Sequence, residues 1–208
     1  ILGFSIFGSK KLYALDENME LRLDELKKFF IENKNNKIFI FGFTFMIFKY
    51  FLIKLKELKM KIDLSGSVLI HGGGWKKLES ESISADEFKK LIYDFTKITS
   101  IHDYYGMVEQ TGSIFMECEN GNLHASVFSD IFIRRFNDFS IADVGEKGII
   151  QTLSLLPGSY PGHSLLTEDE GVFMGEDDCG CGRLGKYFKI YGRVKNAEIR
   201  GCSDTYEG

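Results

Sequence analysis

The most constraining feature of this sequence is the alternation of short apolar runs with amphipathic stretches over residues 1–104. The runs at 37–41, 68–71 and 98–104 have the length and flanking residues of buried strands. Helix-like stretches at 16–34 and 44–61, and a third after Ser84, lie between or before them. Strands that alternate with helices favour an α/β fold whose sheet has parallel members.

Two of these helices carry clear local signals. In the stretch 16–34, apolar side chains at helical spacing form one face and the charges lie opposite; these apolar residues are Leu23, Leu26, Phe29 and Phe30. Ser84 followed by Glu87 is a capping box, and it precedes a second apolar face made of Phe88, Leu91, Ile92 and Phe95. We therefore expect a helix to begin directly after Ser84.

The pattern changes after Gly112 to short alternating runs separated by Gly, Asn and Asp. We expect strands at 125–128, 131–135, 148–153 and 187–191. The predicted fold is thus an α/β, parallel-sheet subdomain at 1–125, then a small β-rich subdomain at 126–193. A C-terminal stub at 194–208 carries Cys202.

Composition limits the classes of partner. The 208 residues have a formal net charge of −4, which gives no broad attraction to nucleic acid or anionic lipid. The apolar stretch 38–55 contains Lys49 and Lys54, so a buried strand followed by a helix is favoured over a membrane span. The apolar start at Ile1 has no charged leader and no cleavage site, so we expect a cytoplasmic protein.

Glycines follow the strand at 68–71. Gly72, Gly73 and Gly74 would let the backbone come close to a planar or phosphorylated ligand, because no Cβ intervenes. A tight turn between strand and helix that needs positive φ angles explains the same glycines equally well.

The segment 104–112 lies where a strand ends, which is where ligands bind in open α/β sheets. The ring of Tyr105 could stack on a purine, and the carboxylate of Glu109 could hold the magnesium ion that accompanies ATP. Ordinary surface residues of a loop are the alternative.

The run Tyr105-Gly106-Met107-Val108-Glu109 resembles the aromatic-Gly-x-Ser/Thr-Glu motif of adenylate-forming ligases, with Val108 in place of the usual hydroxyl residue. A looser similarity to phenylacetate-CoA ligases extends downstream over about ninety residues, with matching order and spacing. It includes Cys118, His124, the 145–148 turn, Pro161 with Asp169, the run 179–183, and Gly192-Arg193.

A closer resemblance is to the acyl-protein synthetases of the bacterial bioluminescence fatty-acid reductase complex, through the runs 71–77, 105–112 and 200–204. The resemblance implies that Gly72 to Gly74 and Tyr105 frame the adenine, with Gly106 in the same nucleotide site. It also implies that Glu109 ligates magnesium and that Asp169 holds the ribose hydroxyls. Arg193 is expected in the same nucleotide site.

Asp169 also has a physical argument of its own. A carboxylate that accepts hydrogen bonds from two ribose hydroxyls is a recurrent way to fix a nucleotide. Its neighbours Glu168 and Glu170 favour the alternative of a solvated acidic turn.

The cysteines form a second line of argument. Cys118, His124, Cys179 and Cys181 supply three thiolates and one imidazole, a set suited to a closed structural zinc site. Reduced cysteines without a metal are the alternative. The remaining Cys202 follows Arg200, which could lower its pKa. The resemblance implies that Cys202 accepts the acyl group as a thioester, and a plain free thiol is the alternative.

The phosphate-binding loop with which such ligases begin does not occur in this sequence, so we expect a fragment of a longer enzyme. The predicted function is ATP-dependent activation of a long-chain fatty acid and its transfer to a protein cysteine. The expected partners are fatty acid, Mg-ATP and an acyl-accepting reductase or acyl-transferase protein. A phenylacetate-type acyl or aryl-CoA ligase and a non-catalytic fragment are the alternatives.

Overall fold

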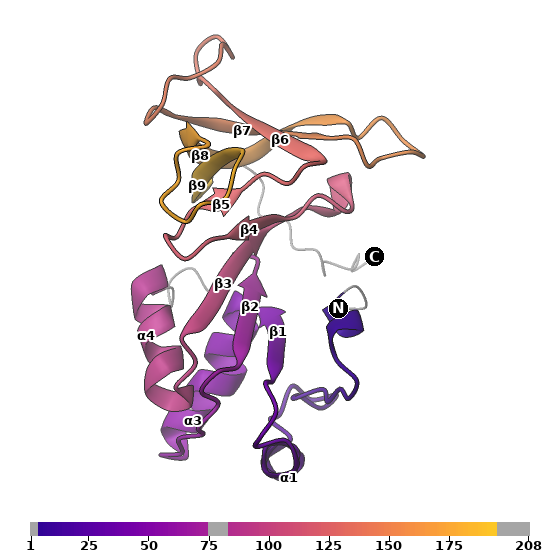
Figure 1. The fold of residues 1–208 in the computed structure, drawn as a ribbon, viewed down its shortest axis with the longest axis vertical. Coiled ribbons are helices and arrows are strands. Elements are labelled where there is room, and N and C mark those ends of the chain that lie inside the picture. Colours follow the sequence, from indigo (N-terminus) through magenta and orange to yellow (C-terminus); the bar gives the residue numbers. More distant parts are fainter. Residues whose placement is uncertain (1–3, 75–82, 195–208) are drawn as a thin grey trace. The chain divides into compact units, whose positions relative to one another are not determined.

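The computed structural model describes residues 4–74 and 83–194, and Figure 1 shows the order of its helices and strands. Contacts divide the chain into a first unit, Ile1–Ile101, and a second unit, His102–Gly208. The strand β3, Ser100–Tyr105, begins at this boundary. We describe each unit by itself.

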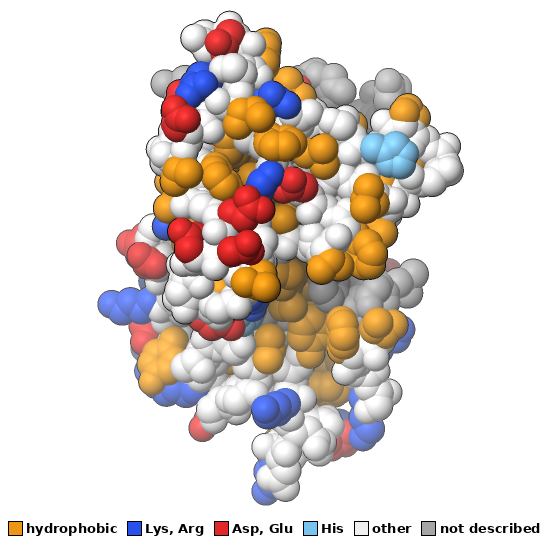
Figure 2. Space-filling model, turned by 45° about the horizontal axis from the view of Figure 1, so that its top comes forward, with side chains coloured by type: hydrophobic (Ala, Val, Ile, Leu, Met, Phe, Trp, Pro, Cys, Tyr) orange, Lys and Arg blue, Asp and Glu red, His pale blue; other side chains and the backbone are white. Residues whose placement is uncertain are grey.

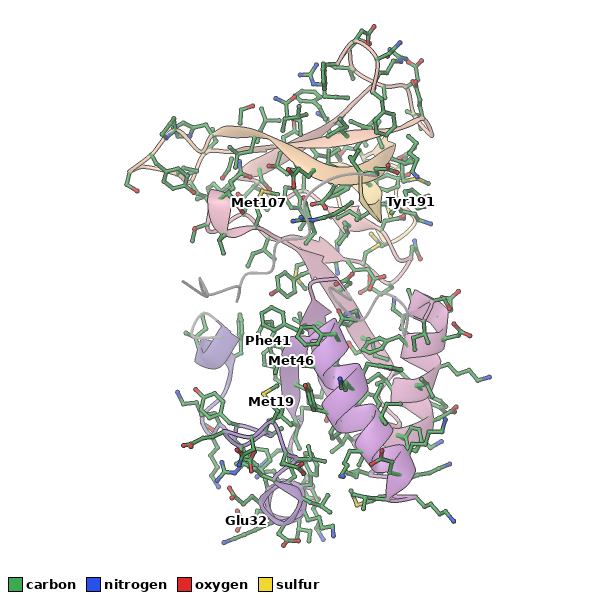
Figure 3. All side chains as sticks on the ribbon, turned by 180° about the vertical axis from the view of Figure 1, so that it is seen from behind. Met19, Glu32, Phe41, Met46, Met107 and Tyr191 are labelled. Carbon is green, nitrogen blue, oxygen red and sulfur yellow. The ribbon has the colours of Figure 1, made fainter. Side chains whose placement is uncertain are left out.

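The first unit is built on two parallel strands. Strand β1, Phe39–Phe43, pairs with β2, Val68–Gly72, so that Phe41 lies opposite Ile70. The helical elements are η1 (Phe4–Phe7), α1 (Leu23–Glu32), α2 (Thr44–Met46), the π-helical η2 (Ile47–Leu52), α3 (Ile53–Glu57) and α4 (Ala85–Thr96). Figure 3 labels Phe41 on β1 and Met46 at the end of α2. The parallel strand pair confirms the predicted α/β character.

The core of the first unit is aliphatic and aromatic. Leu69 of β2 is completely buried, and Phe88 and Ile92 bring one face of α4 into the same core. The other buried members are Ile47, Phe48, Leu52, Leu64, Ile98 and Ile101. Since Phe88 and Ile92 lie four positions apart on α4, they share one helix face, as the sequence predicts.

The predicted helix at 16–34 is shorter in the structure, because α1 begins only at Leu23. The side chain of Asp16 accepts hydrogen bonds from the backbone N–H groups of Asn18 and Glu20, each at 2.9 Å. Met19 has a left-handed φ of 63°, and Leu15 bridges to Leu21. These side chain to backbone bonds stabilise a tight loop that competes with the helix.

The second predicted helix, at 44–61, also differs from the prediction. The stretch from Thr44 to Glu57 is helical, but its middle part is the π-helical η2, and Lys59 has a left-handed φ of 51°. A residue in this conformation ends a helix. The third helix agrees with the prediction: the Ser84 side chain accepts the Glu87 N–H at 3.2 Å, and Glu87 accepts the Ser84 N–H at 3.0 Å.

The second unit is an antiparallel sheet with the strand order β3-β4-β5-β9-β8-β7-β6. The strands after β3 are β4 (Phe115–Glu117), β5 (Leu123–His124), β6 (Ser129–Arg134), β7 (Lys147–Ser154), β8 (Ser164–Glu176) and β9 (Lys186–Arg193). Three of the four predicted strands are present, with shifted ends. Residues 102–125, which the sequence prediction groups with the first subdomain, supply β4 and β5 to this sheet.

One predicted strand is absent here, and one strand that was not predicted is present. Residues 125–128 form a turn, in which Ser129 N–H bonds to Ser126 O at 3.1 Å, instead of a strand. The longest strand, β8, was not predicted because the polar run at 167–170 interrupts its apolar pattern. Its pairing with β7 and β9 on either side supplies what the local pattern lacks.

The core of the second unit contains Phe115, Leu123, Ile131, Ile133, Ala142, Ile150 and Phe188. Glycine is required where β8 approaches this core closely. A Cβ at Gly171 would lie 2.7 Å from Cγ1 of Ile150 and 2.8 Å from the carbonyl oxygen of Lys189. Both separations are too short for real atoms, so only a residue without a side chain fits between β7 and β9.

Among the described residues, no helix has both the length and the apolar character that crossing a membrane requires. The apolar stretch at 38–55 is divided between β1 and the helical elements that follow it. On the face shown in Figure 2, Lys and Arg side chains are interspersed with Asp and Glu and with apolar groups.

Candidate functional site

Tyr105 and Asp169 meet in the second unit, although 64 positions separate them in the sequence. The Tyr105 hydroxyl donates a hydrogen bond to Oδ2 of Asp169 at 2.7 Å. The Tyr105 ring is half-buried, with its centroid 6.0 Å from that of Phe115 and 6.3 Å from that of Phe188. Since Phe115 and Phe188 are fully buried, the Tyr105 ring packs against the core of this unit.

Asp169 is held by its backbone as well. It lies in β8, where its N–H donates to Oγ1 of Thr167 at 3.1 Å, and this hydroxyl donates to Ile150 O at 2.8 Å. Arg193 is its register partner on β9, and Nη1 of Arg193 lies 3.6 Å from Oε2 of Glu168. The sheet therefore brings the predicted residues Asp169 and Arg193 to neighbouring positions.

The environment of Tyr105 favours its protonated form. Burial raises the pKa of the Tyr105 hydroxyl, and the charge of Asp169 and their hydrogen bond raise it further. The charge of Glu109 acts in the same direction. The hydroxyl is consequently a permanent hydrogen-bond donor, and the field of the Glu109 carboxylate reaches the same group.

Glu109 lies in the 3₁₀ segment η4, Val108–Gln110, and its side chain is exposed. Its carbonyl oxygen accepts a hydrogen bond from the Tyr160 hydroxyl at 2.7 Å. The next residue, Gln110, is 1 % exposed and donates through Nε2 to Gly162 O at 2.8 Å. These two bonds fix the segment while the Glu109 carboxylate stays accessible to a cation.

The residues that fix this segment were not found from the sequence. Tyr160 and Gln110 act across about fifty positions, and no spacing rule predicts such a contact. Gly106, in contrast, has a visible structural role, because a Cβ there would lie 3.2 Å from Ser113 O. Its presence is explained by this close approach of two chain segments.

The glycine run lies in the first unit, at the end of β2. Gly73 has a φ of +76°, which only glycine adopts without strain, and Gly72 O accepts a hydrogen bond from Oγ1 of Thr44 at 3.3 Å. The same hydroxyl lies 3.0 Å from Nδ1 of His71. The turn that the sequence suggests is therefore present, and a ligand role for Gly72, Gly73 and Gly74 stays a prediction.

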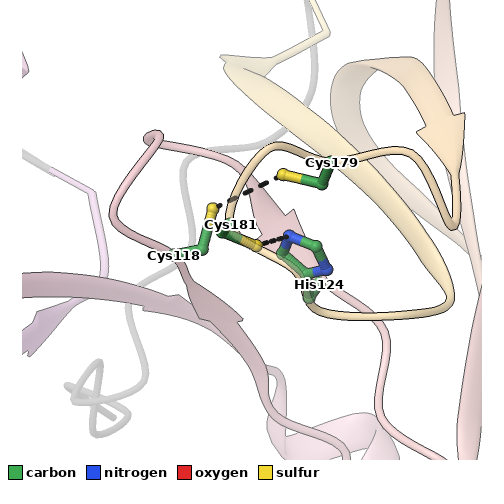
Figure 4. A group of neighbouring side chains, drawn as sticks. All are labelled: Cys118, His124, Cys179 and Cys181. Atoms are coloured by element: carbon green, nitrogen blue, oxygen red, sulfur yellow. Dashed lines mark hydrogen bonds between the residues drawn. The ribbon is translucent and has the colours of Figure 1, made fainter.

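The second site in this unit is the cluster of Cys118, His124, Cys179 and Cys181 shown in Figure 4. One ligand atom from each residue lies within 4.8 Å of all the others. Cys118 directly follows β4, His124 ends β5, and the remaining two cysteines lie in the loop between β8 and β9. All except Cys181 are buried.

The separations fit a tetrahedral metal centre. Sγ of Cys118 and Sγ of Cys179 are 3.9 Å apart, and Sγ of Cys181 is 3.4 Å from Nε2 of His124. Metal–sulfur and metal–nitrogen bonds of about 2.3 and 2.0 Å place sulfur atoms about 3.8 Å apart, and sulfur and nitrogen about 3.6 Å apart, in a tetrahedron. The cluster could therefore hold a metal ion with little rearrangement.

The polar surroundings of the cluster suit thiolate ligands. Although burial raises the pKa of Cys179, hydrogen bonds from the Cys181 N–H and the Asn122 amide lower it to about 6. Burial and the neighbouring thiols raise the pKa of Cys181. Thiolates this close repel one another, and a bound cation would remove that repulsion.

Asn122 is a residue that sequence reasoning missed. Its Nδ2 lies 3.6 Å from Sγ of Cys179, a contact that orients the thiolate. Nδ1 of His124 has no hydrogen-bond partner among residues 4–74 and 83–194. In the sequence, Asn122 directly follows Gly121, and this pair suggests only a turn. Cys202, the predicted nucleophile, lies outside the described residues.

Comparison with known proteins assigns the chain to a family. The model of the family described as "Acyl-protein synthetase, LuxE" matches residues 2–207. The chain belongs to this family. The resemblance inferred from the sequence motifs is thereby confirmed.

Two curated relatives match part of this chain. Long-chain-fatty-acid–luciferin-component ligase of Vibrio harveyi is 29% identical over 140 residues, which is 65% of this chain and 35% of the relative. The ligase of the same name from Aliivibrio fischeri is 27% identical over 152 residues, 69% of this chain and 38% of the relative. The matched region thus spans little more than a third of either relative.

Solved structures share the fold. A long-chain-fatty-acid-CoA ligase from Archaeoglobus fulgidus superposes with a TM-score of 0.55 at 13% identity, over 84% of this chain and 37% of that chain. ATP-bound MatB from Rhodopseudomonas palustris gives a TM-score of 0.52 at 13% identity, over 80% and 33%. This LuxE-family chain therefore has the fold of part of an adenylate-forming ligase domain, as predicted.

Proposed function

We propose that this chain is part of an enzyme that activates a long-chain fatty acid with ATP and transfers the acyl group to a protein thiol. The observation that carries the proposal is the family match over residues 2–207. The two curated relatives are both named as long-chain-fatty-acid ligases, which supports a fatty acid as the substrate. The paired Tyr105 and Asp169, near the exposed carboxylate of Glu109, support a nucleotide site.

In the first step, a carboxylate oxygen of the fatty acid attacks the α-phosphorus of ATP. An oxygen–phosphorus bond forms, the bond to pyrophosphate breaks, and acyl-AMP results. Asp169 would accept hydrogen bonds from the ribose hydroxyls, and Arg193 would contribute a positive charge beside it. The exposed Glu109 would hold magnesium, which neutralises charge on the phosphates.

In the second step, a cysteine thiolate attacks the acyl carbon and AMP leaves with the bonding electrons. Dividing the transfer in this way replaces one difficult displacement by two easier ones. Cys202 is the cysteine that we propose as nucleophile, because Cys118, Cys179 and Cys181 are gathered in the metal-type cluster.

We also propose that the cluster of Cys118, His124, Cys179 and Cys181 holds a structural zinc ion. A set of three thiolates and one imidazole leaves no open coordination position for substrate, so the ion would stabilise the loop rather than catalyse. The ligand separations described above support this role.

The two steps can be tested separately. Titration calorimetry with ATP and magnesium should show saturable binding, and incubation with ATP and a radiolabelled long-chain fatty acid should yield hydroxylamine-sensitive labelled protein. Cys202→Ser should abolish the label but leave ATP binding unchanged, and Ser203→Ala is the matched control. In a parallel incubation that also contains coenzyme A, a labelled coenzyme A thioester in place of labelled protein would favour a CoA ligase. Absent ATP binding would favour a non-catalytic fragment.

A further inference from the structure

We infer that the hydroxyl group of Tyr105 is a positioning group that orients the Asp169 carboxylate for a ribose cis-diol, and so sets the discrimination between ribonucleotides and deoxyribonucleotides. The inference rests on the proposed nucleotide site. It assigns to Tyr105 a polar role in addition to the contact of its ring with the base.

The first observation is that both ends of the hydrogen bond are anchored. The Tyr105 ring packs at the edge of the core, against the fully buried Phe115 and Phe188. Asp169 is held in β8 through its N–H bond to Thr167, whose hydroxyl bonds to Ile150 O. A bond of 2.7 Å between two anchored residues selects one rotamer of the carboxylate.

The second observation concerns the number of hydrogen bonds that the Asp169 carboxylate can still accept. A carboxylate accepts about four hydrogen bonds, and Tyr105 uses one position, on Oδ2. Oδ1 and the remaining position of Oδ2 can accept from two neighbouring hydroxyls. Because the carboxylate is already oriented, binding a diol would cost less conformational entropy than it would with a freely rotating side chain.

The direction of the hydrogen bond also matters. Burial and the charge of Asp169 raise the pKa of the Tyr105 hydroxyl, so it donates at every physiological pH. A permanent donor on Oδ2 keeps the carboxylate an acceptor toward incoming hydroxyls. The positioning effect should therefore not vary between pH 6 and 9.

The test compares Tyr105→Phe with the wild-type protein in the binding of Mg-ATP, 2′-deoxy-ATP and 3′-deoxy-ATP, measured by calorimetry. Phe retains the ring and removes only the hydroxyl. We expect the variant to lose about tenfold in affinity for ATP, the scale of one hydrogen bond to a charged group. Affinity for the deoxynucleotides should change much less, so the ratio between ATP and its deoxy analogues should fall.

Two further variants separate positioning from a loss of structure. Tyr191→Phe removes the hydroxyl of an exposed tyrosine on β9 and should leave all affinities unchanged. In an Asp169→Ala background, adding Tyr105→Phe should cause no further loss of discrimination, because the hydroxyl acts through Asp169. Circular dichroism of each variant reports whether the fold is retained.

The outcomes distinguish this inference from the proposed function. If wild-type protein binds ATP and Tyr105→Phe keeps the same preference for ATP over both deoxynucleotides, the positioning role is refuted while the proposed function stands. An equal loss for all three nucleotides would also refute it, since that is the signature of a structural or stacking effect. Wild-type protein that fails to bind ATP would refute both.

Discussion

The two units of this chain differ in the length of their strands and in what packs against these strands. The first unit packs α4 and the helical stretch after β1 against parallel strands through a continuous apolar core. In the second unit, the strands β4 and β5 are only three and two residues long. The Cys118, His124, Cys179 and Cys181 cluster lies where these short strands meet the loop before β9.

A bound metal would matter most for the short strands of the second unit. Strands of two or three residues bury too little apolar surface to hold their register alone. Ligands that tie together the end of β4, the end of β5 and the β8–β9 loop would add to the few core contacts that Phe115 and Leu123 make from these strands, as they do in small metal-stabilised domains. In the first unit, the paired strands β1 and β2 are each five residues long, and α4 packs its apolar face into the same core as β2.

The largest expected effect follows from removing the metal ligands. Cys179→Ala should reduce bound zinc from about one equivalent to none, and should destabilise the second unit by several kcal/mol. Elemental analysis of protein purified without chelator measures the first effect, and urea unfolding with and without EDTA measures the second. Cys202→Ala is the matched control and should retain the metal. If wild-type protein contains no zinc and its free energy of unfolding is the same with and without EDTA, then the second unit does not depend on a metal and this contrast with the first unit is wrong.

A pair of core substitutions, one in each unit, would show whether the two units are destabilised independently. Leu69→Ala in the first unit and Ile150→Ala in the second each delete buried methyl groups and should cost about 3 kcal/mol. Hydrogen exchange read by mass spectrometry should show faster exchange in β1, β2 and α4 for Leu69→Ala, and in β6 to β8 for Ile150→Ala. Equal acceleration across all peptides for both variants would mean that the two units unfold as one.

The smallest effect concerns the capping box of α4. Ser84→Ala removes the acceptor for the Glu87 N–H and should lower the free energy of unfolding by about 1 kcal/mol. Glu87→Gln keeps a side-chain oxygen acceptor and should cost less. Thermal unfolding monitored by circular dichroism measures both, and equal costs for the two variants would argue against a specific cap.

This cap also has a defined pH dependence. The hydrogen bond from the Ser84 N–H lowers the pKa of Glu87 below its ordinary value. A depressed pKa in the folded state means that the stabilisation is present above the unfolded pKa and is lost as pH falls through the folded pKa. The Ser84 hydroxyl also donates to Oε2 of Glu87 and lowers this pKa, and Ser84→Ala removes that hydrogen bond while it keeps the backbone N–H. The cost of Ser84→Ala should therefore shrink in acid.

Features that depend on neighbours along the chain could be predicted before the fold was known. The capping box at Ser84, the parallel strands β1 and β2, and the turn glycine Gly73 follow from local spacing and backbone preference. The Cys and His residues of the cluster were also identifiable, because their residue types are unusual and few.

The long-range contacts of the site could not be predicted in this way. The hydrogen bond between Tyr105 and Asp169, the contact of Asn122 with Cys179, and the bond from Tyr160 to the Glu109 carbonyl each join segments about fifty or more positions apart. The strand β8 forms despite a polar interruption because strands pair with it on both sides. Such contacts depend on sheet register, and register is fixed by the summed burial of many side chains, which no single segment encodes.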